Sequence, residues 1–191
     1  MGYDYIAFGR FHFDDDLQYQ DAVPMLRRLM QCAQEQGLSF GVKITNTFPV
    51  DVKAGELPSE EMYMSGKSLF PLSIALAAKL SREFDGKLRI SYSGGADAFN
   101  IERIVGAGVW PVTVATTILK PGGYQRLHQI AELLNGLNNQ EFQGIDVEAL
   151  NKLAQDAVTD RHHTKPAKLP VSRKSDEKVP LMFCFQAPCE D

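Results

Sequence analysis

The stretch RISYSGGADAFNIERIVGAGVWPVTVATTIL, residues 89–119, decides the fold. A β-branched run (Leu88–Ser91) overlaps its start and leads into Gly94 and Gly95. An amphipathic segment and a second apolar run follow. Glycine at the exit of a strand lets backbone N–H groups approach a ligand closely, because no Cβ stands in the way. The unpaired N–H groups and positive dipole end of a following helix would add to such a site. The pattern predicts a phosphate site, with a tight turn that needs glycine for its backbone angles as the alternative.

Outside this stretch, predicted strands and helices alternate along the chain. The predicted strands are Tyr3–Phe8, Phe40–Thr45, Leu88–Ser91 and Val112–Ala115. The predicted helices are Asp21–Gln36, Ser68–Glu83, Asp97–Ala107 and Tyr124–Leu137, with a further helix at Asp146–Val158 capped by Asp146. A long polar connection spans residues 46–67. Four strand–helix units predict an α/β fold with a parallel sheet, either half of a (β/α)8 TIM barrel or an open doubly wound sheet.

The composition narrows the class of protein. The chain has 191 residues, a net charge of −4 and 44% hydrophobic residues, which suits one globular domain. No basic stripe interleaved with aromatic residues is present, so we expect no nucleic-acid partner. No apolar run approaches the roughly 20 residues of a membrane span, and the N-terminus lacks a signal-peptide pattern. We therefore expect a cytoplasmic protein in which Cys32 is a small buried residue and no disulfide framework forms.

Small and polar residues gather where three predicted strands end. These ends carry Thr45-Asn46-Thr47, Ser93-Gly94-Gly95 and Ala115-Thr116-Thr117. Ligands bind at the carboxyl ends of the strands in both candidate folds. Three such ends are more than one turn-making glycine would produce, so they favour a phosphate-bearing ligand.

The composition changes after the last predicted helix. Residues 159–182 are rich in Lys, Pro and Ser, which predicts a flexible linker behind a barrel domain of residues 1–158. Within it, we expect His162 and His163 to be solvated rather than to bind a metal.

Two segments carry a resemblance to a known superfamily. MSGKSLFPLSIAL (Met64–Leu76) together with residues 89–119 is similar to the last third of the dihydroorotate and dihydropyrimidine dehydrogenase barrels. In that superfamily the corresponding glycines hold the phosphate of FMN. The resemblance implies the distal half of a TIM barrel of the FMN-linked oxidoreductase type. The phosphate cradle that it implies is formed by Gly66, Gly94, Gly95, Ala115 and Thr116.

A narrower resemblance covers the run FGVKITNTFPVDVKAGELPSEEMYMSG, residues 40–66. This run is similar to the large iron–sulfur flavoproteins of the selenate reductase type. Separately, GVKITN resembles either the lysine strand or the later Asn-Thr strand of the dehydrogenases, and both alignments imply Lys43 and Asn46 as candidates beside the flavin ring. A snorkelling surface lysine is the alternative for Lys43. Two features depart from the family: Ala115 stands where glycine is usual, and no Cys or Ser base for proton transfer is present.

The end of the chain reads CFQAPCED, residues 184–191. In the resembling enzymes an Ala-Pro-Cys segment opens a domain that carries [4Fe–4S] clusters and precedes an FAD and nicotinamide-binding module. The resemblance makes Cys184 and Cys189 the first two ligands of an iron–sulfur motif, and residues 183–191 the start of a truncated cluster domain.

The leading hypothesis is a fragment of a multidomain flavin and iron–sulfur oxidoreductase, inactive in isolation. Its partners would be the rest of its own polypeptide and other oxidoreductase subunits. One alternative is a barrel without flavin that acts as a scaffold, and another is a hydrolytic or aldol enzyme that uses Lys43. Exposed barrel edges predict that the isolated chain associates with itself. We also expect Gly95→Val to abolish phosphate binding and leave the fold intact.

Overall fold

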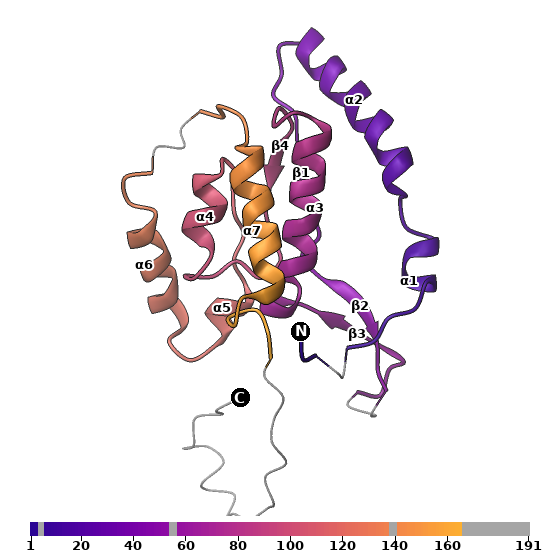
Figure 1. Cartoon of the computed structure of the whole chain (residues 1–191), viewed down its shortest axis with the longest axis vertical. Coiled ribbons are helices and arrows are strands. Elements are labelled where there is room, and N and C mark those ends of the chain that lie inside the picture. Colours follow the sequence, from indigo (N-terminus) through magenta and orange to yellow (C-terminus); the bar gives the residue numbers. More distant parts are fainter. Residues whose placement is uncertain (4–5, 54–56, 138–140, 166–191) are drawn as a thin grey trace, which may run out of the picture.

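The computed structural model describes residues 1–3, 6–53, 57–137 and 141–165 (Figure 1). Its elements in chain order are α1 (Phe11–Asp14), α2 (Tyr19–Glu35), β1 (Gly41–Lys43), β2 (Phe48–Asp51), β3 (Glu61–Met64), the 3-10 helix η1 (Gly66–Ser68), α3 (Phe70–Glu83), β4 (Arg89–Ser91), α4 (Ile101–Gly106), α5 (Thr116–Leu119), α6 (Gly123–Leu133) and α7 (Val147–Thr159).

The central sheet is parallel, as the alternation of elements predicts. Strands β1 and β4 pair in register, with Val42 opposite Ile90. A single parallel bridge between Tyr92 and Val112 adds a third chain segment beside β4. The predicted strand Val112–Ala115 is therefore only one bridge long, because the chain turns at Ala115 and enters α5 directly. This arrangement agrees with part of a TIM barrel.

Two expectations about the first half of the chain are wrong. Residues 3 and 6–8 of the predicted strand Tyr3–Phe8 are not in a strand, although the Ala7 carbonyl accepts the N–H of Asp51 at 2.8 Å. The segment lies beside β2 and joins no parallel ladder. The connection 46–67 is more than a loop, because β2 and β3 form an antiparallel pair with Val50 opposite Met62.

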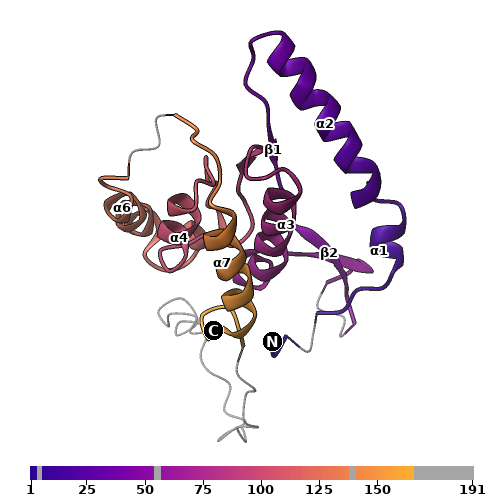
Figure 2. The ribbon, with the colours of Figure 1, turned by 45° about the horizontal axis from the view of Figure 1, so that its top comes forward.

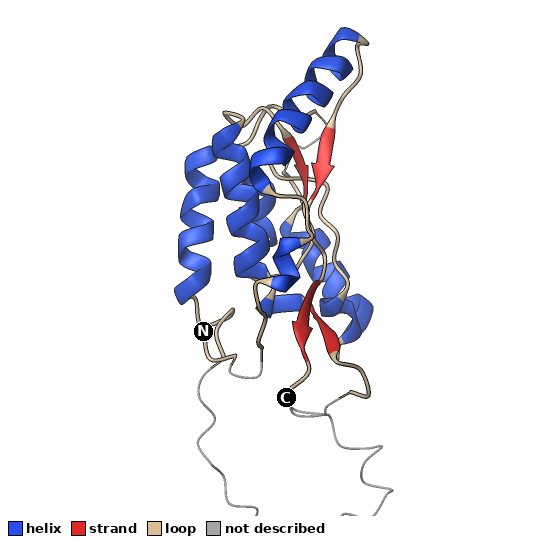
Figure 3. Ribbon diagram, turned by 90° about the vertical axis from the view of Figure 1, so that its right-hand side faces the viewer, coloured by secondary structure: helices blue, strands red, loops and turns tan. Residues whose placement is uncertain are grey.

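The helices pack on one side of the β1–β4 pair, and the core lies between them (Figure 3). Ile74 of α3 and Ile90 of β4 are fully buried there. Helix α7 lies along α3 and contributes Leu150 to the same core. The Asp146 carboxylate accepts the N–H of Ala149 at 2.9 Å, which confirms the predicted cap of α7.

The other side of the pair is open. Gly41 and Lys43 are exposed there, while Val42 between them packs against the core. Helix α2 stands away from α4 and α7 (Figure 2), and its side chains reach α3, where Arg27 pairs with Glu83 at 2.6 Å. Its inner face contacts the core through residues such as Leu26, but the opposite face is bare. Cys32 lies on that bare face and is exposed, so the expectation of a buried cysteine is wrong.

We propose from these open surfaces that the isolated chain associates with itself. Strand β1 has β4 as its only ladder partner within the described ranges, and Met25 and Leu29 on α2 are about half exposed. Unpaired strand edges and apolar helix faces both favour association. Light scattering over a wide concentration range should therefore give a mass that rises above 21.2 kDa. A monomer at every concentration would contradict this prediction.

Candidate functional site

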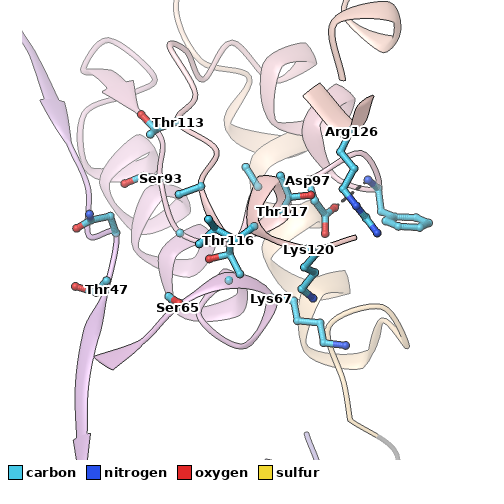
Figure 4. A pocket seen from close by; sticks show the side chains of 18 of the residues that line it. Thr47, Ser65, Lys67, Ser93, Asp97, Thr113, Thr116, Thr117, Lys120 and Arg126 are labelled. Atoms are coloured by element: carbon cyan, nitrogen blue, oxygen red, sulfur yellow. Dashed lines mark hydrogen bonds between the residues drawn. The ribbon is translucent and has the colours of Figure 1, made fainter. Parts of the chain in front are cut away.

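A cavity of about 330 Å³ opens at the carboxyl ends of β1 and β4 (Figure 4). Six separate stretches of the chain, in loops and in helices, form its walls. The lining residues are Asn46, Thr47, Ser65, Gly66, Lys67, Ser93, Gly94, Gly95, Ala96, Asp97, Phe99, Thr113, Ala115, Thr116, Thr117, Leu119, Lys120, Arg126 and His162. All three of the strand ends singled out from the sequence contribute to this wall.

The structure brings most of the predicted site residues together. Asn46 and the whole predicted phosphate cradle line the cavity. Lys43 does not: it is the last residue of β1, it pairs with Ser91, and it lies on the open side of the sheet outside the cavity wall. Cys184 and Cys189 lie outside the described residues, as does most of the predicted linker. Within the described ranges, no group of three or more His, Cys, Asp or Glu could hold a metal ion.

Three glycines make the close contacts between the loops. Gly66, Gly94 and Gly95 all have positive φ, at 64°, 104° and 81°. A Cβ on Gly95 would lie 2.3 Å from the Gly66 carbonyl oxygen, and one on Gly66 would lie 2.8 Å from Cγ2 of Thr116. Glycine is needed both for the turn and for the approach of the loops. The expectation that Gly95→Val leaves the fold intact is therefore wrong.

The glycine loop holds backbone N–H groups that are not used by the described part of the protein. The N–H groups of Gly94, Gly95 and Ala96 donate no hydrogen bond within the described part of the chain. The carbonyls are held instead: Gly94 O accepts the Tyr92 hydroxyl at 3.0 Å, and Gly95 O accepts Nδ2 of Asn100 at 2.9 Å. Burial raises the pKa of the Tyr92 hydroxyl, which keeps it protonated as a donor. The loop thus presents fixed donors for an anion.

The N–H groups of Gly94, Gly95 and Ala96 belong to a loop and not to the start of helix α4. Helix α4 begins only at Ile101 and has six residues. The segment 97–100 before it is a turn, in which Oδ1 of Asp97 accepts the N–H of Phe99 at 2.9 Å. No helix starts at Asp97, so the predicted donors from the first turn of that helix are absent. The candidate anion donors in this segment are the N–H groups of the glycine loop.

Sequence reasoning missed a pair of side chains at the edge of the cavity. Nε2 of His162 lies 2.6 Å from Oδ2 of Asp97, and the centroid of its ring lies 4.1 Å from that of the exposed Phe99 ring. The next residue, His163, is 2% exposed and stacks at 4.2 Å on Phe70. The expectation that the two histidines are solvated is wrong. Their partners lie far away in the sequence, so local composition could not reveal them.

Three cations at the rim were also missed. Lys67, Lys120 and Arg126 come from η1, the turn after α5 and α6, and Figure 4 shows them on the same side of the cavity. Nε of Arg126 donates to the Pro121 carbonyl at 2.8 Å, which holds the guanidinium group in place. With the Asp97 carboxylate, the three cations leave two positive charges at the rim. This charge complements the dianion of a phosphate monoester.

Comparison with known proteins identifies the family. A family model described as "Oxidoreductase YgfK, N-terminal TIM-barrel domain" matches residues 1–165. The chain belongs to this family. It is 49% identical over 188 residues to "Putative oxidoreductase YgfK" of Escherichia coli K12, and equally to the protein of that description in E. coli O157:H7. The match covers 98% of the chain but only 18% of each relative, so the chain spans less than a fifth of their length.

A solved structure is also similar. The crystal structure of ligand-free type DHODH from Eimeria tenella aligns with a TM-score of 0.46 and 23% sequence identity, over 70% of this chain and 37% of that one. The fold assignment rests on the family, which confirms the predicted TIM-barrel class. None of the described helices combines the length and apolar character needed to cross a membrane.

The burial of His163 makes the stability of the fold depend on pH. Burial lowers the pKa of its imidazole, and the nearby His162 and Lys67 lower it further, against Asp160 and Asp97, which raise it. An unperturbed histidine has a pKa of about 6.5. Above that value the ring is neutral in both the folded and the unfolded chain. As the pH falls below it, only the unfolded chain takes up the proton freely, so the folded state loses stability.

We therefore predict that acid weakens the fold through His163. The thermal midpoint of the wild-type chain should fall between about pH 7.5 and about pH 5.5, more than that of His163→Phe, which keeps a ring to stack on Phe70 but cannot be protonated. The other histidines are shared by both proteins and cancel in the comparison. Equal falls in the two proteins would contradict the prediction.

Proposed function

We propose that this chain supplies the phosphate-binding part of the flavin site of an oxidoreductase. The observation that carries the proposal is the cradle. In it the loops of Gly66 and of Gly94–Gly95 meet the Ala115–Thr116 segment, beside N–H groups that have no acceptor in the described part of the chain and a rim of three cations. The site suits a terminal phosphate, because the glycine loop lines the cavity and its N–H groups would be donors for the phosphate oxygens. FMN is the ligand that the family resemblance indicates. When bound, it supplies reversible transfer of a hydride.

The chain's own residues would hold and orient such a ligand. The loop of Gly94 and Gly95 would donate to the phosphate, while Lys67, Lys120 and Arg126 would neutralise its charge. Asn46 lies in the cavity wall and is a candidate contact for the remainder of the ligand. Lys43 keeps a proposed role beside the flavin ring, because the open side of β1 corresponds to the interior of a closed barrel.

We further propose that the chain works as part of a longer polypeptide. Cys184 and Cys189 would begin an iron–sulfur domain, and an FAD and nicotinamide module would follow, so that electrons pass between a nicotinamide, flavins and clusters. Reduction of selenate remains a proposal for the acceptor. The rest of the polypeptide and other oxidoreductase subunits are the proposed partners, and the cytoplasm is the proposed location.

A scaffold without flavin is the second candidate. Ala115 in place of the usual glycine favours it, because a methyl group stands at one wall of the cavity. The two candidates differ in one property: only the first requires the cavity to recognise a phosphate monoester.

Comparison of FMN with riboflavin tests this property, because the two differ only by the phosphate. We predict that the chain binds FMN at least about tenfold more tightly than riboflavin in a fluorescence titration, since charge-assisted hydrogen bonds contribute about 1.5–3 kcal/mol each. The triple variant Lys67→Gln, Lys120→Gln, Arg126→Gln should lose this preference. Lys152→Gln, on the exposed side of α7, is the matched control and should keep it. Equal affinities for FMN and riboflavin in the wild type would overturn the proposal and leave the scaffold.

A further inference from the structure

The segment that follows α7 folds back onto the domain instead of leaving it. Residues 160–165, called the strap below, begin with a turn in which the carbonyl of Asp160 accepts the N–H groups of His163 and Thr164, both at 3.0 Å. The Tyr3 hydroxyl donates to the His163 carbonyl at 3.0 Å, and the Lys165 N–H donates to the Met1 carbonyl at 2.8 Å. The strap is therefore fixed on both sides, and Figure 1 places the N-terminal end beside the end of α7.

The strap touches the cavity through one histidine and supports it through the other. The ring of His162 is part of the cavity wall. The ring of His163 packs under Phe70, and a Cβ built on Gly95 would lie 2.9 Å from the Cβ of Phe70. The glycine loop thus rests on a side chain that the strap covers.

Asp97 joins the strap to the same loop. One carboxylate oxygen accepts the N–H of Phe99 and holds the turn behind the glycines, and the other binds His162. Side-chain exposures of 16% for Asp97 and 26% for His162 show that this pair is largely shielded from water. Release of the strap would free the carboxylate, open one wall of the cavity and uncover Phe70.

We propose that the strap is a movable wall of the cavity and that its docking is coupled to occupation of the cavity by a phosphate-bearing ligand. The inference rests on the proposed function. A ligand binds more tightly to the docked state, because that state alone offers the His162 wall and the restrained loop. By reciprocity, the ligand must then stabilise docking by the same factor. Ligand binding would thus fix the point from which the chain departs toward Cys184 and Cys189.

Trypsin offers a direct readout, because Arg161 is exposed and lies in the strap itself. In the 191-residue chain, cleavage after Arg161 requires the strap to open, so its rate relative to the other tryptic cleavages of the same sample reports on docking. We expect saturating FMN to slow cleavage after Arg161 at least fivefold, as followed by mass spectrometry, and riboflavin to leave it unchanged.

The reciprocal effect, that of strap docking on ligand affinity, is tested by substitution of His162. His162→Ala should weaken FMN binding at least fivefold and remove the FMN-dependent protection, while His162→Gln, which keeps a donor for Asp97, should restore part of both. His128→Ala is the control, since His128 is exposed on α6 beside Glu132 and should change neither readout.

The outcomes separate the two proposals. If the wild type prefers FMN over riboflavin but cleavage is unchanged by FMN and His162→Ala binds FMN normally, the coupling is wrong and the proposed function stands. If the wild type shows no preference for FMN, both are wrong. If His162→Ala has a thermal midpoint too low for these assays, His162→Gln takes its place. Wild-type FMN affinity and wild-type cleavage in His162→Gln would likewise overturn the coupling.

Discussion

Gly95→Ala is expected to destabilise the folded chain by about 2–6 kcal/mol, from backbone strain at positive φ together with overpacking. The φ of Gly95 is 81°, and the added Cβ would lie 2.3 Å from the carbonyl oxygen of Gly66. Since the obstacle is backbone, a side-chain rotation cannot relieve it, and the loop of Gly66 must shift. Urea unfolding followed by circular dichroism measures the change, and binding should be lost together with stability.

Gly106→Ala is the matched control for this variant. Gly106 lies at the end of α4, and a Cβ built there meets no atom within 4 Å. Alanine also has the higher helix propensity, so we expect a change of no more than about 1 kcal/mol, in the stabilising direction. Equal stabilities of Gly95→Ala and Gly106→Ala would show that the loops do not meet as described.

Phe70→Ala is expected to cost about 3–5 kcal/mol, the usual range for deletion of a buried phenyl ring. Phe70 is 0% exposed, and its ring lies between Tyr92 and His163. The loss should appear as a lower urea midpoint. Because the strap loses its stacking partner, trypsin should also cleave faster after Arg161 under conditions in which the variant remains folded.

Phe99→Ala is the matched control for Phe70→Ala, because it removes a ring that contacts the strap but lies outside the core. Phe99 is 72% exposed and contacts the ring of His162, so its removal should change the urea midpoint by less than about 1 kcal/mol. A small effect of Phe70→Ala, similar to that of Phe99→Ala, would be inconsistent with a core that extends under the glycine loop.

Local patterns were sufficient to predict the regular elements with strong periodicity. The apolar spacing that predicted Asp21–Gln36 and Ser68–Glu83 corresponds to α2 and α3, within two residues at each end. The capping role of Asp146 also followed from sequence, because a cap depends only on the next few residues. The glycine loop was recognised because its backbone requirement is local.

Features that depend on distant partners could not be predicted in this way. The strap has the polar composition of a linker, and its docking relies on Asp97, which lies 65 residues from His162. The sequence does not predict the β2–β3 pair, because its apolar alternation is only four residues long in each strand. The aromatic run at Tyr3–Phe8 suggested a strand, but its neighbour in space is the edge of β2 and not the parallel sheet.

In the candidate site, too, local features are predictable from the sequence and features that depend on distant partners are not. Glycines and strand ends marked the cradle, since the folds considered bind ligands at that edge of the sheet. The three cations could not be found, because Lys67, Lys120 and Arg126 share no spacing and meet only in the folded chain. Lys43 is a candidate by resemblance alone, and in the structure it is exposed on the open side of β1.

Backbone amide resonances test most directly whether a phosphate binds at the glycine loops. In a ¹H–¹⁵N titration of the chain, FMN and inorganic phosphate should both shift the amides of Gly66, Gly94, Gly95, Ala96 and Thr116, and riboflavin should not. Shifts confined to other regions, such as the Arg89–Trp110 contact at the opposite end of β4, or no shifts with FMN and phosphate, would contradict a phosphate cradle in this domain.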